Sequence, residues 1–459
     1  MQQLFLEHAL LPDGWRNNVS VKITAEGTIL SLTPDSKRKG QDSYGIALPG
    51  IVNAHSHAFQ RAMAGLAEYR QSGHDSFWTW RKVMYKFLAS LTPEDQRVIS
   101  SQLQIELLKH GYTSLVEFHY VHKKPGGSAY ADPSAMSQSV LDAAVETGIG
   151  MTLIPTLYMS ADFDHPGLMP EQTRFNSDLE FIDRVLSDCA GQTEANPDLV
   201  LGIAAHSLRA VPPKSLEELL EVRKSRNLRP FHIHIAEQTK EVEACLKHTG
   251  ERPVSWLLNH APVDHNWTLV HSTHCDADEV NRLAQTKAAV ALCPTTEGNL
   301  GDGIFPLTDF LSRGGRITIG SDSHVSVSPW EELRWLEYVQ RLAGRKRNVI
   351  TINGEANTGT SLFLHLMASA ASVSGRSTGE LSVGKRADLI ILDDTLPQFE
   401  ARTPTQILDT AIFACNSNPV RHVMVGGRWL VRDGRHVGEN MIAKEYQQVL
   451  RRLGAGVYT

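Results

Sequence analysis

The segment Asn53-Ala54-His55-Ser56-His57 ends an apolar run that begins at Ile46, and it carries the clearest chemical signal in the chain. Side chains alternate between the two faces of a β-strand, so His55 and His57 point to the same face. Two imidazoles on one face are suited to bind a borderline-soft divalent metal such as zinc. A lone His-x-His pair in a strand is more often ordinary polar decoration, so a metal site requires further ligands.

Further ligand-type side chains lie at the C-terminal ends of other predicted strands, namely His234 with Glu237, His271, and Asp322. Each has an ordinary structural explanation on its own, and Asp322 could merely cap the following helix. His232 shares a face with His234 but lies one layer deeper, so we expect it to be a hydrogen-bonded interior residue. Chance assembly of the whole set at separate strand ends is improbable, and the set predicts a catalytic metal site.

The elements that must position these residues form a repeating pattern of strand and helix. Helices are indicated over 93–110, 216–226 and 329–342. Such β-then-α units predict an α/β fold, a parallel (β/α)₈ TIM barrel whose chemistry lies at the C-terminal ends of the strands. The predicted strands are 46–53, 113–118, 151–157, 199–205, 230–235, 267–271, 289–293 and 316–320.

Short β-rich segments occupy both ends of the chain. They comprise 18–23 and 28–32 near the start, and 387–392, 422–425 and 428–431 near the end. A small β-sandwich built from both ends is the economical way to cover their apolar faces. We therefore expect three parts: 1–45 as the N-terminal part of the sandwich, 46–377 as the barrel, and 378–459 as the C-terminal part of the sandwich with a terminal helix.

Composition narrows the class of protein. The chain has 459 residues, 41% hydrophobic and 21% charged residues, which is ordinary for a globular protein. A net charge of -6 without a long basic run argues against nucleic acid as a partner. Five scattered cysteines without a C-x-x-C pair suggest a reducing compartment. No secretion signal and no run near the ~18 apolar residues of a membrane span is present, so we expect a cytoplasmic protein without membrane contact.

The ordered motifs resemble the amidohydrolase superfamily over nearly the whole chain. Its first-strand His-x-His, strand-five His-x-x-Glu, strand-six His and strand-eight Asp match His55 and His57, His234 and Glu237, His271, and Asp322. Binuclear members carry a carboxylated lysine or a glutamate at the end of strand four, where this chain has Ala204-Ala205-His206-Ser207. The resemblance therefore implies one zinc ion per subunit, held by His55, His57, His234 and Asp322.

The same resemblance implies hydrolysis of a C–N bond by a zinc-activated water. Asp322 would accept the proton of this water and His271 would steady the developing tetrahedral charge. Glu237 would carry a proton to the departing nitrogen, which is general acid–base catalysis.

Within the superfamily, residues 54–61, 78–81, 206–209 and 292–303 resemble the deiminases that act on N-formimino-L-glutamate. This resemblance implies conversion of that substrate to N-formyl-L-glutamate and ammonia in histidine degradation, by a homodimer. It assigns the two substrate carboxylates to Arg81, Tyr120 and Arg209, and the formimino end to Gln60 and His206. Independently, two arginines near the mouth of an acidic protein suggest bidentate capture of carboxylates.

The residues are also compatible with other functions. A deaminase of guanine, S-adenosylhomocysteine or another heterocycle would use stacking groups such as Trp78 and Trp80. A ring-opening hydrolase of the imidazolonepropionase type, or a barrel that has lost its activity, are further alternatives. An inactive barrel typically lacks some of the ligands that this chain retains. Glu297 could either favour a cationic amidine or brace its loop.

Overall fold

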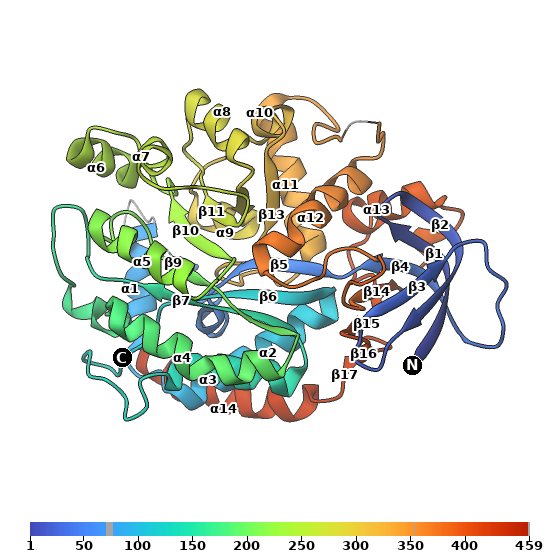
Figure 1. Cartoon of the computed structure of the whole chain (residues 1–459), viewed down its shortest axis with the longest axis horizontal. Coiled ribbons are helices and arrows are strands. Elements are labelled where there is room, and N and C mark those ends of the chain that lie inside the picture. The colour runs from blue at the N-terminus through green and yellow to red at the C-terminus, as the bar shows by residue number, and fades with distance from the viewer. Residues whose placement is uncertain (70–76, 353, 458–459) are drawn as a thin grey trace.

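Figure 1 shows the computed structural model, which describes residues 1–69, 77–352 and 354–457. A barrel of parallel strands surrounded by helices forms the larger part, and a sheet made by both chain ends lies at one side of it. No helix in these described ranges combines the length and apolar character that a membrane crossing requires.

The barrel has the parallel strand order expected from the sequence, and it confirms the (β/α)₈ prediction. The strands pair in parallel in chain order, except that the two short strands at 199–201 and 203–205 both pair with the strand at 150–157 and only the second continues to the next strand. The strands are β5 (Ile51–Ser56), β6 (Tyr112–His119), β7 (Gly150–Leu157), β8 (Leu199–Leu201), β9 (Ile203–Ala205), β10 (Phe231–Ile235), β11 (Trp267–His271), β12 (Ala289–Leu292) and β13 (Arg316–Ile319).

The last and first strands meet where the ligand-type residues lie. The Asp322 backbone N–H donates to the His55 carbonyl at 3.0 Å, and the His57 N–H donates to the Asp322 carbonyl at 3.2 Å. Gly320 permits this approach, because a Cβ atom there would lie 2.7 Å from the His55 Cβ. The backbone thus brings Asp322 beside the His-x-His pair.

Two of the predicted strands are divided in the structure. The run 46–53 splits at Gly50, because β4 (Asp42–Pro49) pairs with strands of the other sheet and only β5 enters the barrel. The run 199–205 is interrupted at Gly202 into β8 and β9. Continuous apolar runs are buried on both faces, so their pattern contains no sign of the change of partner.

The chain ends form one eight-stranded sheet in the order β17-β16-β15-β14-β4-β1-β2-β3. The pairing of β1 with β4 is parallel, and the other neighbours are antiparallel. β1, which the sequence pattern did not reveal, therefore joins the N-terminal hairpin to the rest. The remaining bounds are β1 (Gln2–Leu11), β2 (Gly14–Ile23), β3 (Ile29–Thr33), β14 (Leu389–Leu392), β15 (Val420–Val425), β16 (Arg428–Arg432) and β17 (Arg435–His436).

Helices cover the outside of the barrel, and α2 (Pro93–His110) has the bounds that were predicted. Thr92 caps it, with the Asp95 N–H donating to the Thr92 hydroxyl at 3.2 Å. The final helix, α14 (Glu439–Val457), runs back from the sheet along the barrel and packs on α1 and α2.

The other helices are α1 (Phe77–Leu88), α3 (Ala135–Thr147), α4 (Leu179–Ala195), α5 (Pro213–Ser225), α6 (Thr239–Thr249), α7 (Pro253–His260), α8 (Ala277–Thr286), α9 (Pro294–Leu300), α10 (Leu307–Ser312), α11 (Pro329–Gly344), α12 (Thr358–Ser374) and α13 (Pro404–Phe413). Short 3-10 turns are η1 (Ala58–Met63), η2 (Pro170–Phe175) and η3 (Pro397–Phe399).

Candidate active site

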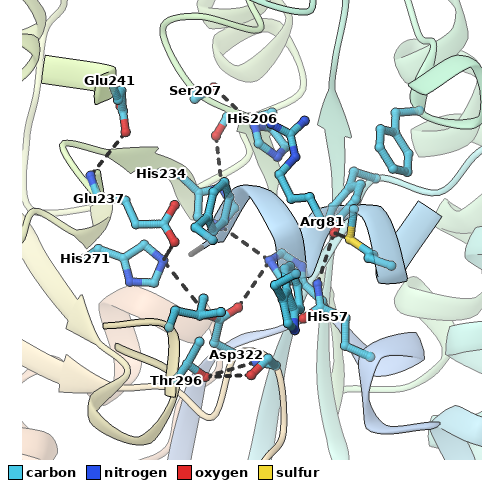
Figure 2. A pocket seen from close by; sticks show the side chains of 18 of the residues that line it. His57, Arg81, His206, Ser207, His234, Glu237, Glu241, His271, Thr296 and Asp322 are labelled. Atoms are coloured by element: carbon cyan, nitrogen blue, oxygen red, sulfur yellow. Dashed lines mark hydrogen bonds and ion pairs between the residues drawn. The ribbon is translucent and has the colours of Figure 1, made fainter. Parts of the chain in front are cut away.

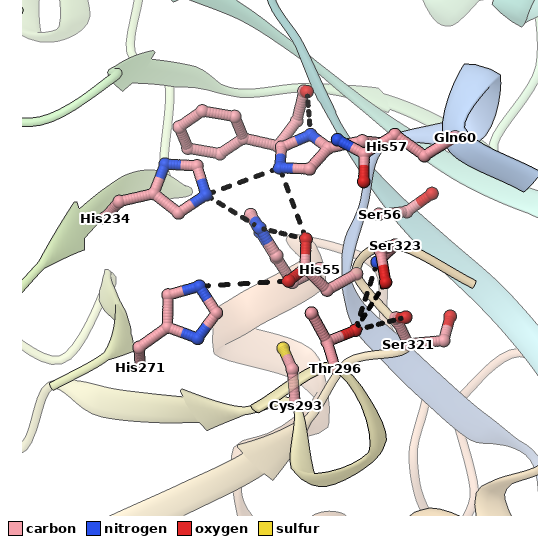
Figure 3. A network of polar contacts seen from close by, with 12 residues as sticks. His55, Ser56, His57, Gln60, His234, His271, Cys293, Thr296, Ser321 and Ser323 are labelled. Carbon is pink, nitrogen blue, oxygen red and sulfur yellow. Dashed lines mark hydrogen bonds and ion pairs between the residues drawn. The ribbon is translucent and has the colours of Figure 1, made fainter. Parts of the chain in front are cut away.

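Four side chains from three strand ends, those of His55, His57, His234 and Asp322, converge at the C-terminal mouth of the barrel. Figure 3 shows the three histidines, and Figure 2 shows Asp322. The Nε2 atom of His234 lies 3.0 Å from that of His55 and 3.4 Å from that of His57. The Asp322 Oδ1 atom lies 3.5 Å from the Nε2 of His55 and 3.4 Å from the Nε2 of His57. We call these four residues the metal cage.

The hydrogen bonds of the metal cage show that it fits a cation. His57 and His234 direct their Nδ1 atoms at the backbone carbonyls of Phe118 (2.9 Å) and His206 (3.0 Å), so each Nδ1 must carry the proton. The Nε2 atoms of these neutral rings then face each other with lone pairs. Four donors bound tetrahedrally to zinc are roughly 3.3–3.4 Å apart, close to the separations observed.

Burial keeps these imidazoles neutral. Together with the neighbouring rings, it holds the pKa of His55 and of His234 well below the usual value. Burial also lowers the pKa of His57, although Asp322 and the Phe118 carbonyl oppose this. Neutral imidazoles offer the lone pairs that a metal requires.

His271 lies beside the metal cage and is bound differently. Its Nδ1 is 3.2 Å from Glu297 Oε1, while its Nε2 faces Glu237 Oε1 at 3.8 Å and Asp322 Oδ2 at 3.9 Å. Burial opposes protonation, yet these three carboxylates raise the pKa of His271 to about 10. A protonated His271 therefore presents an N–H to the pocket.

The contacts of Glu297 support one of its two interpretations. Its Oε1 accepts a 2.9 Å hydrogen bond from the Cys293 N–H in addition to the His271 contact. Glu297 thus braces the start of α9 and orients His271. His232 is the interior residue that was predicted, since it is fully buried and its Nε2 contacts the Val373 carbonyl at 3.0 Å.

Glu237 follows β10 on a turn that Glu241 holds. The two carboxylate oxygens of Glu241 accept the N–H groups of Ala236 (3.0 Å) and Glu237 (3.1 Å). This turn places Ala236 at a φ of 51°, which is unusual for a residue with a side chain. Burial raises the pKa of Glu237 to about 7. His271 opposes this rise, and the negative charges of Asp322 and Glu241 add to it. A carboxyl with such a pKa can exchange a proton near neutrality.

A pocket of about 630 Å³, part of it open to solvent, lies above the metal cage. Arg81 and His206 lie across it from Glu237 and His271 (Figure 2). Gln60 donates to the Tyr120 hydroxyl at 3.1 Å on the pocket wall. The pocket is also lined by Phe77, Trp80, Tyr158, Phe175, Arg209 and Glu241.

The two arginines of the pocket form no ion pair with any residue that the structure describes. Arg81 donates to the Tyr85 hydroxyl and packs on Trp78, with its guanidinium carbon 5.3 Å from the ring centre. Arg209 donates to the Ala161 carbonyl at 3.3 Å. Partly buried cations without a carboxylate partner are suited to receive an anionic ligand. We call Arg81 and Arg209 the arginine clamp.

The predicted site residues line this pocket, except His55, which belongs to the metal cage but is not among the lining residues. The pocket adds two residues that sequence reasoning missed. Tyr158 directly follows β7, so its place after a strand was a usable signal. Glu241 gave only a weak signal, because a glutamate in the first turn of a helix is commonplace.

Comparisons with known proteins agree with this geometry. The pattern of the Amidohydrolase family matches residues 46–430, and that of the N-terminal domain of formimidoylglutamate deiminase HutF matches residues 1–45. The formimidoylglutamate deiminase of Pseudomonas aeruginosa is 47% identical over 99% of this chain and 100% of its own length. The 8-oxoguanine deaminase of the same organism is 29% identical over 87% of this chain and 85% of its own.

Solved structures give the same result. The crystal structure of an amidohydrolase from Brucella melitensis superposes with a TM-score of 0.94 and 39% identity, covering 99% of this chain and 100% of that one. An adenosine deaminase from Xanthomonas campestris with bound zinc shares the fold, with a TM-score of 0.82, 16% identity and coverage of 99% and 98%. The chain is therefore a homologue of formimidoylglutamate deiminase, and it belongs to the amidohydrolase family.

Proposed function

We propose that the chain hydrolyses N-formimino-L-glutamate to N-formyl-L-glutamate and ammonia, a step of histidine degradation. The observation that carries this proposal is a single pocket with the metal cage at one side and the arginine clamp at the other. An amidine carbon and two carboxylates within one small molecule match these two features. The 47% identical relative named as a formimidoylglutamate deiminase supports the assignment.

The metal cage would hold one zinc ion through His55, His57, His234 and Asp322. When bound, zinc supplies the Lewis acidity that makes a water molecule nucleophilic at neutral pH. The strand-four end, Ala204-Ala205-His206-Ser207, offers neither the lysine nor the glutamate that bridges two metals in binuclear relatives, which supports a single ion.

The remaining polar groups would handle protons and charge. Asp322 would take a proton from the attacking water at Oδ2, the oxygen that faces His271. His271 would donate from Nε2 to the oxygen that becomes negative as the formimino carbon turns tetrahedral. Glu237, with a pKa of about 7, would carry the proton to the departing nitrogen.

Substrate orientation would come from the rest of the pocket. Arg81 and Arg209, with the Tyr120 hydroxyl, would bind the two carboxylates. Gln60 and His206 would line the formimino end, beside the metal cage. Bidentate guanidinium–carboxylate pairing fixes orientation as well as affinity.

Ammonia release from a panel of substrates tests this proposal. We expect turnover of N-formimino-L-glutamate and background rates with guanine and S-adenosylhomocysteine. The second candidate is a heterocycle deaminase, because the aromatic side chains of Phe77 and Trp80 line the pocket and could stack on a ring. Faster turnover of a purine would replace the first proposal with the second, and consumption of imidazolonepropionate would support a ring-opening hydrolase.

We also propose a homodimer in the cytoplasm. Both expectations come from the family resemblance and the sequence composition. Sedimentation analysis of the purified chain would test the dimer.

A further inference from the structure

We propose that Gln172, through Tyr85 and Tyr158, fixes the separation of the two arginines in the clamp and so selects dicarboxylates by length. This inference rests on the proposed function, because it takes the arginine clamp as the carboxylate site. It concerns residues outside the metal cage.

The first half of the connection leads from Gln172 to Arg81. Arg81 donates a hydrogen bond to the Tyr85 hydroxyl one turn further along α1. The turn that carries Gln172 reaches the same tyrosine, because the Phe175 ring centre lies 6.1 Å from that of Tyr85. Burial raises the pKa of Tyr85, and Arg81 and the Gln172 side chain partly offset this rise. The Arg81 guanidinium also lies 5.4 Å from the centre of the Tyr85 ring. Tyr85 therefore restrains Arg81 through its hydroxyl group.

The second half leads from Gln172 to Arg209. The Gln172 Nε2 donates to the Tyr158 hydroxyl at 3.0 Å, and both side chains are at least 97% buried. The Tyr158 hydroxyl in turn interacts with the Arg209 guanidinium; burial alone would lower the pKa of Arg209, and Tyr158 helps to raise it. One amide thus connects the supports of both arginines.

The turn that carries Gln172 is itself fixed. The Gln172 Oε1 accepts the Met169 N–H at 3.0 Å. Arg174, two residues along the turn, donates to the carbonyls of Leu91 (2.9 Å) and Lys123 (2.9 Å) and to that of Leu88 at the end of α1. η2 is therefore attached to the helix that presents Arg81.

Phe175 completes the support by packing between the tyrosines. Its ring centre lies 6.1 Å from that of Tyr85 and 5.3 Å from that of Tyr158. The clamp is thus held by hydrogen bonds and by an aromatic spacer from one turn.

A clamp with fixed spacing discriminates by chain length. Removal of one methylene moves a carboxylate by roughly 1 Å, and misplacement on this scale can cost about 10²-fold in rate. If the two arginine side chains could move, they would adjust to the shorter ligand, and the discrimination by chain length would be lost. The predicted consequence of loosening Gln172 is therefore a change in selectivity.

The test compares glutarate with succinate, which is one methylene shorter, by calorimetric binding to the zinc-loaded protein. The variants are Gln172→Met, which keeps the shape but removes the amide, and Tyr158→Phe, which removes the hydroxyl. Glu171→Gln, an exposed neighbour in the same turn, is the matched control. Thermal unfolding and bound zinc are measured for every variant.

We expect the wild type and Glu171→Gln to prefer glutarate. Loss of the polar contacts that hold the arginines in place should reduce this preference by about three- to tenfold in Gln172→Met and in Tyr158→Phe. The double variant should lose no more than the larger single effect, because both act through one connection. Unfolding temperature and zinc content should match the wild type.

An unchanged preference for glutarate in both single variants would overturn the inference, as would a wild type that binds neither acid. Glutarate binding that responds to these variants, in a protein that releases no ammonia from N-formimino-L-glutamate, would support the inference and contradict the proposed function. Ammonia release from N-formimino-L-glutamate and from N-formimino-L-aspartate is therefore measured on the same samples.

Discussion

Two buried polar clusters lie at opposite ends of the barrel, and they are paired in different ways. Asp198, Arg376, Arg386 and Asp388, which we call the base cluster, lie at the N-terminal end of the strands beside the sheet of chain ends. Arg376 donates to Asp198 at 2.6 Å and to Asp388 at 2.8 Å, and Arg386 donates twice to Asp198 at 2.8 Å. All four carboxylate oxygens accept at least one hydrogen bond, whereas the buried Arg376 Nε has no hydrogen-bond partner among the described residues.

The metal cage has the opposite character. Its imidazoles are as deeply buried as the base cluster, yet Nε2 lone pairs face one another at 3.0–3.4 Å. Buried polar groups are normally satisfied, so buried lone pairs that converge on one point fit a shared cation. The pairing of opposite charges, rather than burial, therefore separates the cluster that stabilises the fold from the cluster that acts.

The largest expected effect comes from breaking the metal cage. His234→Ala should lose zinc and reduce turnover by an amount on the order of 10⁴-fold or more, because unassisted water has a pKa about nine units above that of zinc-bound water. The metal-free variant should unfold at or above the temperature of the metal-free wild type, since a facing lone pair is removed. Metal analysis, ammonia release and calorimetry measure this, with His265→Ala, an exposed loop histidine, as control.

Breaking the base cluster should lower the stability of the fold and leave zinc binding and turnover unchanged. Asp198→Asn leaves two buried guanidinium groups without their shared carboxylate, which should cost about 3–5 kcal/mol of unfolding free energy. The folded fraction should keep its zinc and its kcat. Urea unfolding measures the loss, and Asp278→Asn, in an exposed pair with Arg282, should change stability by less than about 1 kcal/mol. Equal losses in the two variants would remove the distinction between paired and exposed carboxylates.

A change in the arginine clamp should lower catalytic efficiency without affecting zinc binding or the stability of the fold. Arg209→Ala should lower kcat/KM for N-formimino-L-glutamate by about 100-fold, because a carboxylate loses its partly buried partner. Bound zinc and unfolding temperature should stay as in the wild type. Arg184→Ala, an exposed arginine of α4, should behave as the wild type. Turnover that is unchanged in Arg209→Ala would contradict the clamp.

The smallest expected effect is a pH dependence that belongs to the base cluster. Burial favours protonation of Asp198, but Arg376 and Arg386 outweigh it and hold the pKa of this carboxyl below its usual value. Asp198 therefore stabilises the fold above its unfolded pKa of about 3.9, and this contribution is lost as the pH falls through the folded pKa. The difference in unfolding temperature between wild type and Asp198→Asn should narrow from pH 7 towards pH 3. A difference in unfolding temperature that stays constant between pH 7 and pH 3 would contradict a lowered pKa of Asp198 in the folded protein.

The sequence predicted the metal cage because its ligands are tied to strand ends. A residue at or just beyond the end of a parallel strand is carried to one mouth of the barrel whatever the loops do. This holds for His234 and Asp322 of the metal cage and for His271 beside it. Period-two alternation within a strand likewise placed His55 and His57 together. These inferences needed only the order of the strands.

Features that depend on loop conformation could not be predicted. The support of the arginine clamp by Gln172 requires η2 to fold back against α1, and no local pattern encodes this contact. The roles of Glu241 and Glu297 depend on hydrogen bonds to turn N–H groups that follow from the final backbone. The division of the run 46–53 between two sheets also depends on tertiary pairing.

The claim that one cation completes the metal cage is tested most directly by adding zinc back to metal-stripped protein. Ammonia release from N-formimino-L-glutamate is measured at each addition, together with the zinc bound per chain. The account predicts no release above background without metal and a linear rise that stops at one zinc per chain. Full activity without metal, or a rise that continues to two ions per chain, would contradict it.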